Sequence, residues 1–164
     1  MSDHNARGPL HGYLVIDLTR ALAGPHAGMM LGDLGARVVK VETPDGGDDS
    51  RGWGPPFVGP QDNPISTYFL SCNRNKESVT ADLKTGEGRD VFTGLVRRAD
   101  VLLENFRPGV TRRLGIDFDT LKQYNPRLIY ASISGFGQHG PLSNKPAYDI
   151  VAQAMSGLMS VTGF

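Results

Sequence analysis

Residues 14–42 read LVIDLTRALAGPHAGMMLGDLGARVVKVE, and this stretch decides the fold class. The segments Leu14–Ile16 and Val38–Glu42 are short, apolar and rich in β-branched residues, as buried parallel strands are. Between them, Pro25 suits the first turn of a helix and Gly35 suits its end. The apolar residues of this helix are spaced to lie on one face: Met29, Met30, Leu31 and Leu34. Strand, helix and strand in about thirty residues predict a βαβ unit.

Outward from this unit, strands and helices continue to alternate. The sequence predicts strands over Ser78–Asp82, Val101–Glu104 and Leu128–Ile133, and helices over Thr85–Ala99, Pro108–Leu114, Phe118–Tyr124 and Asp149–Met159, the last broken at Gly157. Residues Thr43–Pro64 are rich in glycine and proline and predict a long loop. The aromatic residues in and just after this loop indicate that it packs against the body: Trp53, Phe57, Tyr68 and Phe69. Alternation of this kind predicts an α/β fold with a mostly parallel sheet.

Composition narrows the function classes. The chain has 164 residues, with 17 Lys and Arg against 17 Asp and Glu. A neutral chain gives no general reason to expect a nucleic acid or an anionic membrane as partner.

The one cysteine, Cys72, excludes an intrachain disulfide and fits a reducing compartment, so we expect a cytoplasmic protein. Cys72 is either a nucleophile or a small core residue, and the absence of a nearby histidine favours the core.

The ends of the predicted strands carry the candidate site, because ligands of parallel sheets bind at the carboxyl ends of the strands. After the first strand the chain shows no GxGxxG fingerprint. Ala21, Ala23 and Gly24 instead place small residues at a helix N-terminus, where a ligand can approach the backbone closely. A tight turn without a ligand fits these residues equally well.

Basic residues recur in the loops at this edge, and Arg and Lys suit phosphate groups. They are Arg20, Arg51, Arg74, Lys76, Arg107, Arg112, Arg113 and Lys145. The run Asn105–Gly109 combines an amide, an aromatic ring and a cation. It either binds a purine and its phosphates, with Phe106 stacking, or forms a strand-end turn with a core Phe.

The histidines lack metal-ligand spacing, so no metal is expected. Asp149 is read as the N-cap of the last helix.

These motifs together resemble the N-terminal part of the class III CoA-transferases, the superfamily of formyl-CoA transferase, carnitine CoA-transferase and 2-methylacyl-CoA racemase. The resemblance runs from about Gly12 to Phe164. The segments that carry it are specific together and not singly, and they include Val15–Thr19, Ala23–Pro25, Leu34–Glu42, Glu104–Gly109, Asn125–Tyr130, Ser134–Gly137 and Tyr148–Asp149. The resemblance implies a flexible N-terminus over 1–11 and, over 12–164, part of a Rossmann-like, CoA-binding large domain whose remainder and small domain are absent.

Members of this family move CoA from an acyl-CoA donor to a small carboxylic acid acceptor. The resemblance implies that an aspartate attacks the donor and forms covalent intermediates. The positions that match CoA contacts are Ala21, Leu22, Ala23, Arg74, Asn75, Lys76, Asn105, Phe106, Arg113 and Leu114. Tyr148 matches a residue near the reacting thioester. Acyl-CoA is the expected substrate and the expected assembly is an interlocked homodimer.

Two departures qualify the resemblance. The family's nucleophilic aspartate lies beyond the position that matches Phe164, so we expect the isolated chain to be inactive. The second departure is length, since family members are more than twice as long as this chain. Related racemases usually carry a histidine where this chain has Tyr148, which favours a transferase over a racemase. The alternative functions are a racemase-type isomerase and a non-catalytic CoA-binding or interaction fragment.

Overall fold

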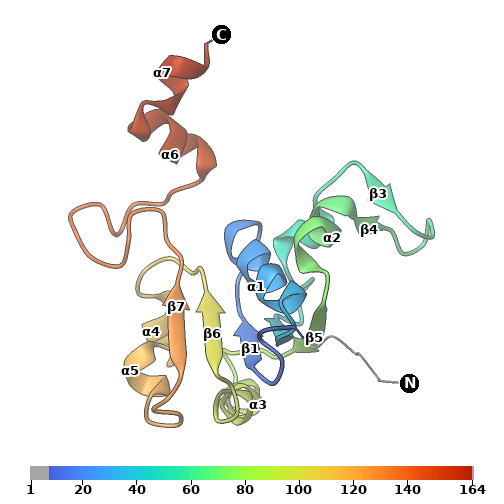
Figure 1. Ribbon diagram of the computed structural model, residues 1–164, viewed down its shortest axis with the longest axis vertical. Helices are drawn as coiled ribbons and strands as arrows, with labels where there is room; N and C mark the ends of the chain where they lie inside the picture. Colours follow the sequence, from blue (N-terminus) through green and yellow to red (C-terminus); the bar gives the residue numbers. More distant parts are fainter. Residues whose placement is uncertain (1–7, 164) are drawn as a thin grey trace.

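A computed structural model describes residues 8–163, and its centre is a sheet of five parallel strands. The strands are β1 (Leu14–Asp17), β2 (Arg37–Glu42), β5 (Lys76–Thr80), β6 (Val101–Glu104) and β7 (Ile129–Ser132). Their order across the sheet is β5-β2-β1-β6-β7 (Figure 1). The chain therefore builds outward from β1 in one direction and then crosses to build outward in the other, which is the Rossmann order. The predicted α/β fold with a parallel Rossmann-like sheet is confirmed.

Two apolar clusters lie on the two faces of the sheet, because successive strand residues point to opposite faces. The larger contains Ile16 and Leu102 and packs against α3 (Gly86–Val96), where Phe92 and Val96 are fully buried. Short helices α4 (Val110–Leu114) and α5 (Phe118–Leu121) extend this layer. The smaller contains Val15 and Val38 and packs against α1 (Ala23–Asp33). This second face is less covered, and Ile129 of β7 is 63% exposed on it.

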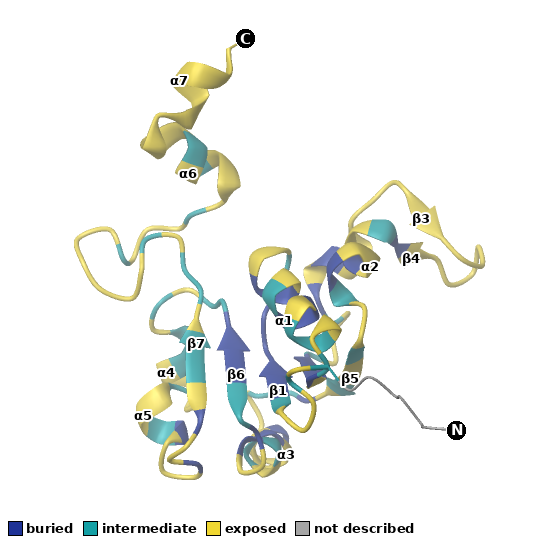
Figure 2. Cartoon of the chain, viewed as in Figure 1, coloured by how far each residue is buried: buried dark blue, intermediate teal, exposed yellow. Residues whose placement is uncertain are grey.

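Two segments project from the body at the carboxyl edge of the sheet. One comprises the 3-10 turn η1 (Asp49–Gly52), the hairpin of β3 (Phe57–Val58) and β4 (Ile65–Ser66), and helix α2 (Thr67–Asn73). The other comprises α6 (Asp149–Ser156) and α7 (Leu158–Thr162), separated at Gly157 as predicted. Figure 2 shows both projections as largely exposed, in contrast to the buried strands β1 and β6.

The segment between β2 and β5 differs from the prediction. The expected loop contains η1 and β3. Of the four aromatic residues expected to pack down, only Phe69 is buried, whereas Trp53, Phe57 and Tyr68 are 41%, 43% and 36% exposed. Helix α2 was not predicted, since it is too short to show helical periodicity and buries only Phe69 and Cys72. Its start is marked by Ser66, whose hydroxyl accepts from the Phe69 N–H at 3.2 Å.

The ends of the chain add little to this core. Of the N-terminal segment expected to be flexible, residues 1–7 lie outside the described residues, and the Leu10 N–H donates to Leu34 O at 2.9 Å. Within the described part of the chain, the helices are all too short or too polar to cross a bilayer.

Candidate functional site

The strand order reverses between β1 and β6, and the loops that leave these two strands are bonded to each other. Asn105, directly after β6, accepts from the Arg20 N–H at 2.9 Å and donates to Arg20 O at 2.8 Å. The side chain of Arg20 lies over the Phe106 ring, 5.9 Å from its centroid. This reversal is where open α/β sheets bind ligands, so the two loops frame the candidate site.

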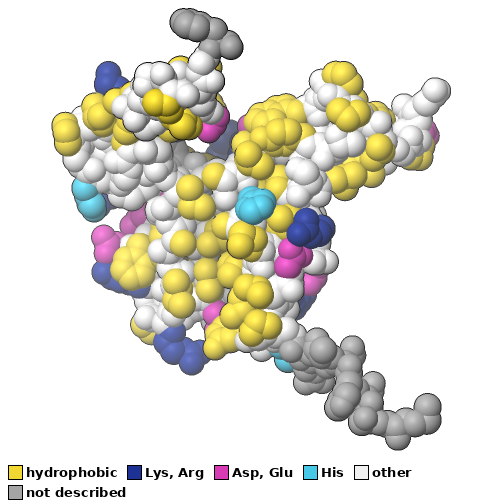
Figure 3. Space-filling view, turned by 45° about the horizontal axis from the view of Figure 1, so that its top comes forward, with side chains coloured by type: hydrophobic (Ala, Val, Ile, Leu, Met, Phe, Trp, Pro, Cys, Tyr) yellow, Lys and Arg dark blue, Asp and Glu magenta, His cyan; other side chains and the backbone are white. Residues whose placement is uncertain are grey.

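A cleft of about 560 Å³ opens between these loops and the two projecting segments. Residues that follow β1, β6 and β7 form the floor of the cleft. Trp53 and Tyr68 form one wall, and the segment that leads into α6 forms the other. Figure 3 shows the two projections as lobes on either side of a hollow. The volume is within the range of sites for cofactors and drug-sized ligands.

The charges on the cleft are mostly positive. Arg20, Arg107 and Lys145 line it, against the single carboxylate of Asp149. Helix α1 adds to this, because residues 21–23 at its N-terminus line the cleft and its N-cap residue Leu22 makes no side-chain cap, so the positive end of the helix dipole lies at the cleft. A cleft of this charge in a neutral chain favours an anionic ligand over a cationic one.

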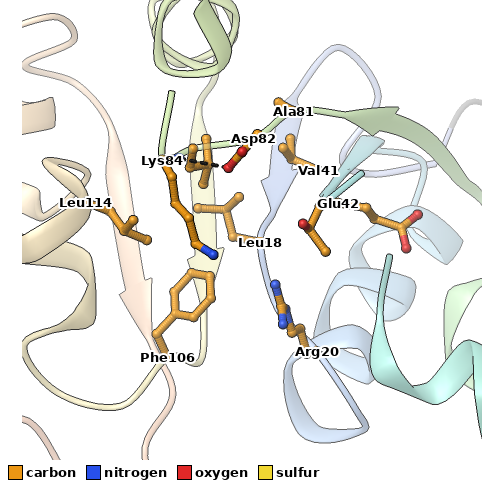
Figure 4. A pocket seen from close by; sticks show the side chains of 11 residues that line it. Leu18, Arg20, Val41, Glu42, Ala81, Asp82, Lys84, Phe106 and Leu114 are labelled. Carbon is orange, nitrogen blue, oxygen red and sulfur yellow. Dashed lines mark hydrogen bonds between the residues drawn. The ribbon is translucent and has the colours of Figure 1, made fainter. Parts of the chain in front are cut away.

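A smaller pocket of about 80 Å³ adjoins the cleft, and Arg20 and Phe106 line both. Lys84 and Arg20 extend into it from opposite sides, with Phe106 below Lys84 (Figure 4). Leu114 closes another side. A ligand longer than the small pocket would therefore pass Arg20 and Phe106 on its way into the cleft.

Buried charges lie beneath the loop that follows β1. The Lys76 ammonium lies 2.8 Å from Asp17 Oδ2 and also donates to Pro25 O and Asn73 Oδ1. Burial lowers the pKa of Lys76, and the neighbouring Asp17 carboxylate opposes that effect. A second pair joins Lys40 to Asp48 at 2.8 Å. These pairs are scaffolding for the site and not part of its surface.

The structure divides the predicted site residues into two groups. Six line the cleft: Ala21, Leu22, Ala23, Asn105, Phe106 and Tyr148. Leu114 lines the small pocket, as noted, while Arg113 is exposed on α4 and lines neither. The sequence therefore identified the floor of the cleft and one residue of its wall.

The remaining predicted residues, which follow α2, lie elsewhere. Arg74 and Asn75 both bond Asp33 at the far end of α1, with Arg74 Nη2 to Asp33 Oδ2 at 2.6 Å and Asn75 Nδ2 to Asp33 Oδ1 at 2.7 Å. That end is about 15 Å from the N-terminus of the eleven-residue helix. The side chain of Lys76 is 2% exposed, and its three donors are occupied.

Two smaller predictions have clear outcomes. Cys72 is a core residue, fully buried in α2, where burial raises the pKa of its thiol. The prediction that Asp149 caps α6 is wrong: Tyr148 is the N-cap residue, and Asp149 is the first helical residue and accepts from the Gln153 side chain. A carboxylate in a first helical turn is favoured by the dipole without capping.

Sequence reasoning gave no role to several residues that line the site. Trp53 and Tyr68 form an edge-to-face pair with centroids 4.9 Å apart; Trp53 lies in the predicted loop and Tyr68 in α2, which was not predicted. Lys84 follows β5 at the same edge of the sheet as Arg20 and Asn105. Its place after a predicted strand was the signal that could have identified it.

Comparisons with known proteins agree with this geometry. The chain matches the profile of CoA-transferase family III over residues 10–164. It is 52% identical over 97% of its length to a succinate–glutarate CoA-transferase of Agrobacterium fabrum, and 56% identical over 96% to an acetyl-CoA:oxalate CoA-transferase of Acetobacter aceti. A crystal structure of a CAIB/BAIF family protein from Brucella suis superimposes with a TM-score of 0.91, at 49% identity over 96% of this chain.

The match covers this chain almost completely and its relatives only in part. The chain spans 40% and 39% of the two CoA-transferases and 41% of the Brucella suis protein. The family profile nevertheless extends over nearly all of the described residues, including every strand of the sheet and the whole lining of the cleft. The chain belongs to CoA-transferase family III.

Proposed function

We propose that this chain supplies the acyl-CoA-binding part of a CoA-transferase that moves CoA from an acyl-CoA donor to a small carboxylic acid. The observation that carries the proposal is the cleft at the reversal of strand order, where Arg20, Arg107 and Lys145 face the uncapped N-terminus of α1. Coenzyme A carries phosphate groups at one end and a flexible thiol arm at the other. The small pocket beside Arg20 and Phe106 suits the first and the long cleft suits the second.

In this proposal each part of the site has a separate task. Arg20 and Lys84 hold the phosphates at the small pocket, Lys145 attracts the anionic ligand along the cleft, and the Phe106 ring offers an apolar face to the nucleotide. Leu22 and Ala23 let the arm lie against the backbone at the start of α1. Tyr148, 71% exposed on the opposite wall, lies beside the reacting thioester. Contacts from Arg74, Asn75, Lys76 and Arg113 stay predictions.

The chemistry that this proposal assigns to the whole protein is acyl transfer through an aspartate outside these residues. Relatives named for succinate, glutarate and oxalate support a small carboxylic acid as the acceptor. The expected homodimer also belongs to the proposal. It is supported by the exposed apolar side chains of the α6–α7 projection, among them Ile150 and Val161 at 65% and 78% exposure. The cytoplasmic location stays a prediction.

Calorimetric titration of CoA into the chain tests the proposed site. Saturable binding is expected, and Arg20→Gln and Lys145→Gln should each weaken it about fivefold or more, because each removes a cation from the ligand's path. Arg98→Gln is the matched control, since Arg98 is exposed at the opposite edge of the sheet, just before β6. Equal losses in all three variants would indicate nonspecific charge attraction and would contradict the proposal.

The competing functions give different results in the same protein. If the chain is a CoA-binding module with no part in transfer, it binds CoA, but the full-length protein fails to exchange CoA between a succinyl-CoA donor and glutarate. A racemase exchanges the α-proton of a 2-methylacyl-CoA and transfers nothing. Transfer of CoA by the full-length protein, weakened together with CoA binding in Arg20→Gln, supports the proposed function.

A further inference from the structure

The turn at the end of β1 holds an alanine in a conformation that alanine avoids. Ala21 has a φ of 65°, in the left-handed region, which costs a residue with a Cβ about 1–2 kcal/mol. Hydrogen bonds from side chains outside the turn hold it there. The Ala21 N–H donates to Asp48 Oδ1 at 3.1 Å, and Lys40 Nζ donates to Thr19 O at 2.7 Å.

Asp48 is the centre of this arrangement. Its Oδ1 also accepts from the N–H and the hydroxyl of Ser50, at 3.0 and 2.8 Å. Its Oδ2 accepts no aligned hydrogen bond from the described residues, and the Lys40 ammonium at 2.8 Å balances its charge. The side chains of Lys40 and Asp48 are 2% and 0% exposed. Burial acts to raise the pKa of Asp48, but the Lys40 ammonium and the Ser50 N–H outweigh it and lower the pKa below its ordinary value.

Asp48 itself does not line the cleft, whereas Ala21 and the two residues after it do. The direction of the chain at Ala21 decides where Leu22 and Ala23 begin α1, because a change of φ at one residue rotates everything that follows. Without the bond from Asp48, Ala21 would relax toward the right-handed or extended regions that alanine prefers. The Leu22 and Ala23 backbone would then leave the cleft floor.

We propose that Asp48 is a positioning residue for ligand binding: its carboxylate, paired with Lys40, fixes Ala21 in the left-handed conformation and so preforms the floor of the cleft at Leu22 and Ala23. The inference rests on the proposed function, because it takes acyl-CoA as the ligand. This role differs from a purely structural role for Asp48 in one respect. Removing the Asp48 carboxylate must weaken binding by changing the φ angle of Ala21.

A double-mutant cycle between Asp48 and Ala21 tests this directly. Asp48→Ala should weaken CoA binding about tenfold, since it removes the hydrogen bond that offsets the cost of the left-handed φ of Ala21. In an Ala21→Gly background the same change should weaken binding only about twofold, because glycine adopts a positive φ without steric cost. Equal losses in the two backgrounds, or full affinity in Asp48→Ala, would overturn the inference.

Amide hydrogen exchange on the unliganded chain provides a second measurement that needs neither CoA nor a variant. The Ala21 amide should exchange at least about tenfold more slowly than an unprotected amide, because its partner Asp48 is fully buried. Exchange at the unprotected rate overturns the inference even if the chain binds CoA. A protected Ala21 amide in a chain that binds no CoA counts against the proposed function and leaves the preformed turn standing.

Discussion

Arg51 binds Glu42 through two parallel hydrogen bonds, from Nε to Oε1 at 2.8 Å and from Nη2 to Oε2 at 2.6 Å. Glu42 ends β2 and Arg51 lies in η1, so the pair ties the segment between β2 and β5 to the sheet. Ser78 of β5 donates to the same carboxylate at 2.5 Å. Burial acts to raise the pKa of Glu42, but these hydrogen bonds and one from the Asp48 N–H outweigh it and hold the pKa at about 2, against an ordinary 4.5.

This pair predicts a loss of stability in acid. A folded-state pKa below the unfolded value stabilises the fold above the unfolded pKa, and the contribution disappears as the pH falls from 4.5 toward about 2. The contribution is up to about 3 kcal/mol, reduced by solvent screening because Arg51 is 40% exposed. Urea unfolding across this range should show a steeper loss for the wild type than for Glu42→Gln. Parallel curves would show that Glu42 is not the titrating group.

The bond between Asn105 and Arg20 predicts a coupled loss of stability and binding. Asn105→Ala leaves the Arg20 N–H and carbonyl without their partner, which should cost about 1–3 kcal/mol in thermal or urea unfolding and weaken CoA binding. Asn63→Ala is the control, since Asn63 is exposed in the hairpin loop. An Asn105→Ala chain as stable as this control would show that water replaces both bonds.

Helix α3 offers a matched pair of valines for a packing test. Val96 is fully buried against the sheet and Val91 is 52% exposed on the same helix. Val96→Ala should lower the free energy of unfolding by about 2 kcal/mol, from lost burial and a residual cavity. Val91→Ala should change it by less than about 0.5 kcal/mol. Similar losses at both positions would contradict the assignment of one apolar face to α3.

Cys72 predicts slow alkylation in the folded chain. The thiol is fully buried and burial raises its pKa, so both access and the thiolate fraction are reduced. Labelling with iodoacetamide should proceed far more slowly in buffer than in denaturing urea, and its rate should follow the opening of α2. Rapid labelling of the native chain would show that Cys72 is accessible and would again make it a candidate nucleophile.

The parts of the fold that sequence alone could predict are those with local signals. The strands β1, β2 and β6 are short β-branched runs, and α1 and α3 have apolar spacing with clear ends, so each was placed within a few residues. Helix α2 and the β3–β4 hairpin carry no such period. Their conformation depends on contacts outside each element, such as Ser66 Oγ to Trp53 O at 2.5 Å within the same segment and Cys72 Sγ to Ala21 O at 3.5 Å from a residue 51 positions away.

The candidate site divides in the same way. By itself the sequence determined the βαβ unit, the edge of the sheet where the candidate cleft lies, and the small residues Ala21 and Ala23 that follow β1. It could not determine which cations reach that edge. Lys76, predicted to contact CoA, is buried against Asp17, which is 59 residues away in the chain, whereas Lys84 enters the small pocket. Only the tertiary structure decided this, because a charged side chain faces solvent or a buried partner according to neighbours that the folded chain brings together.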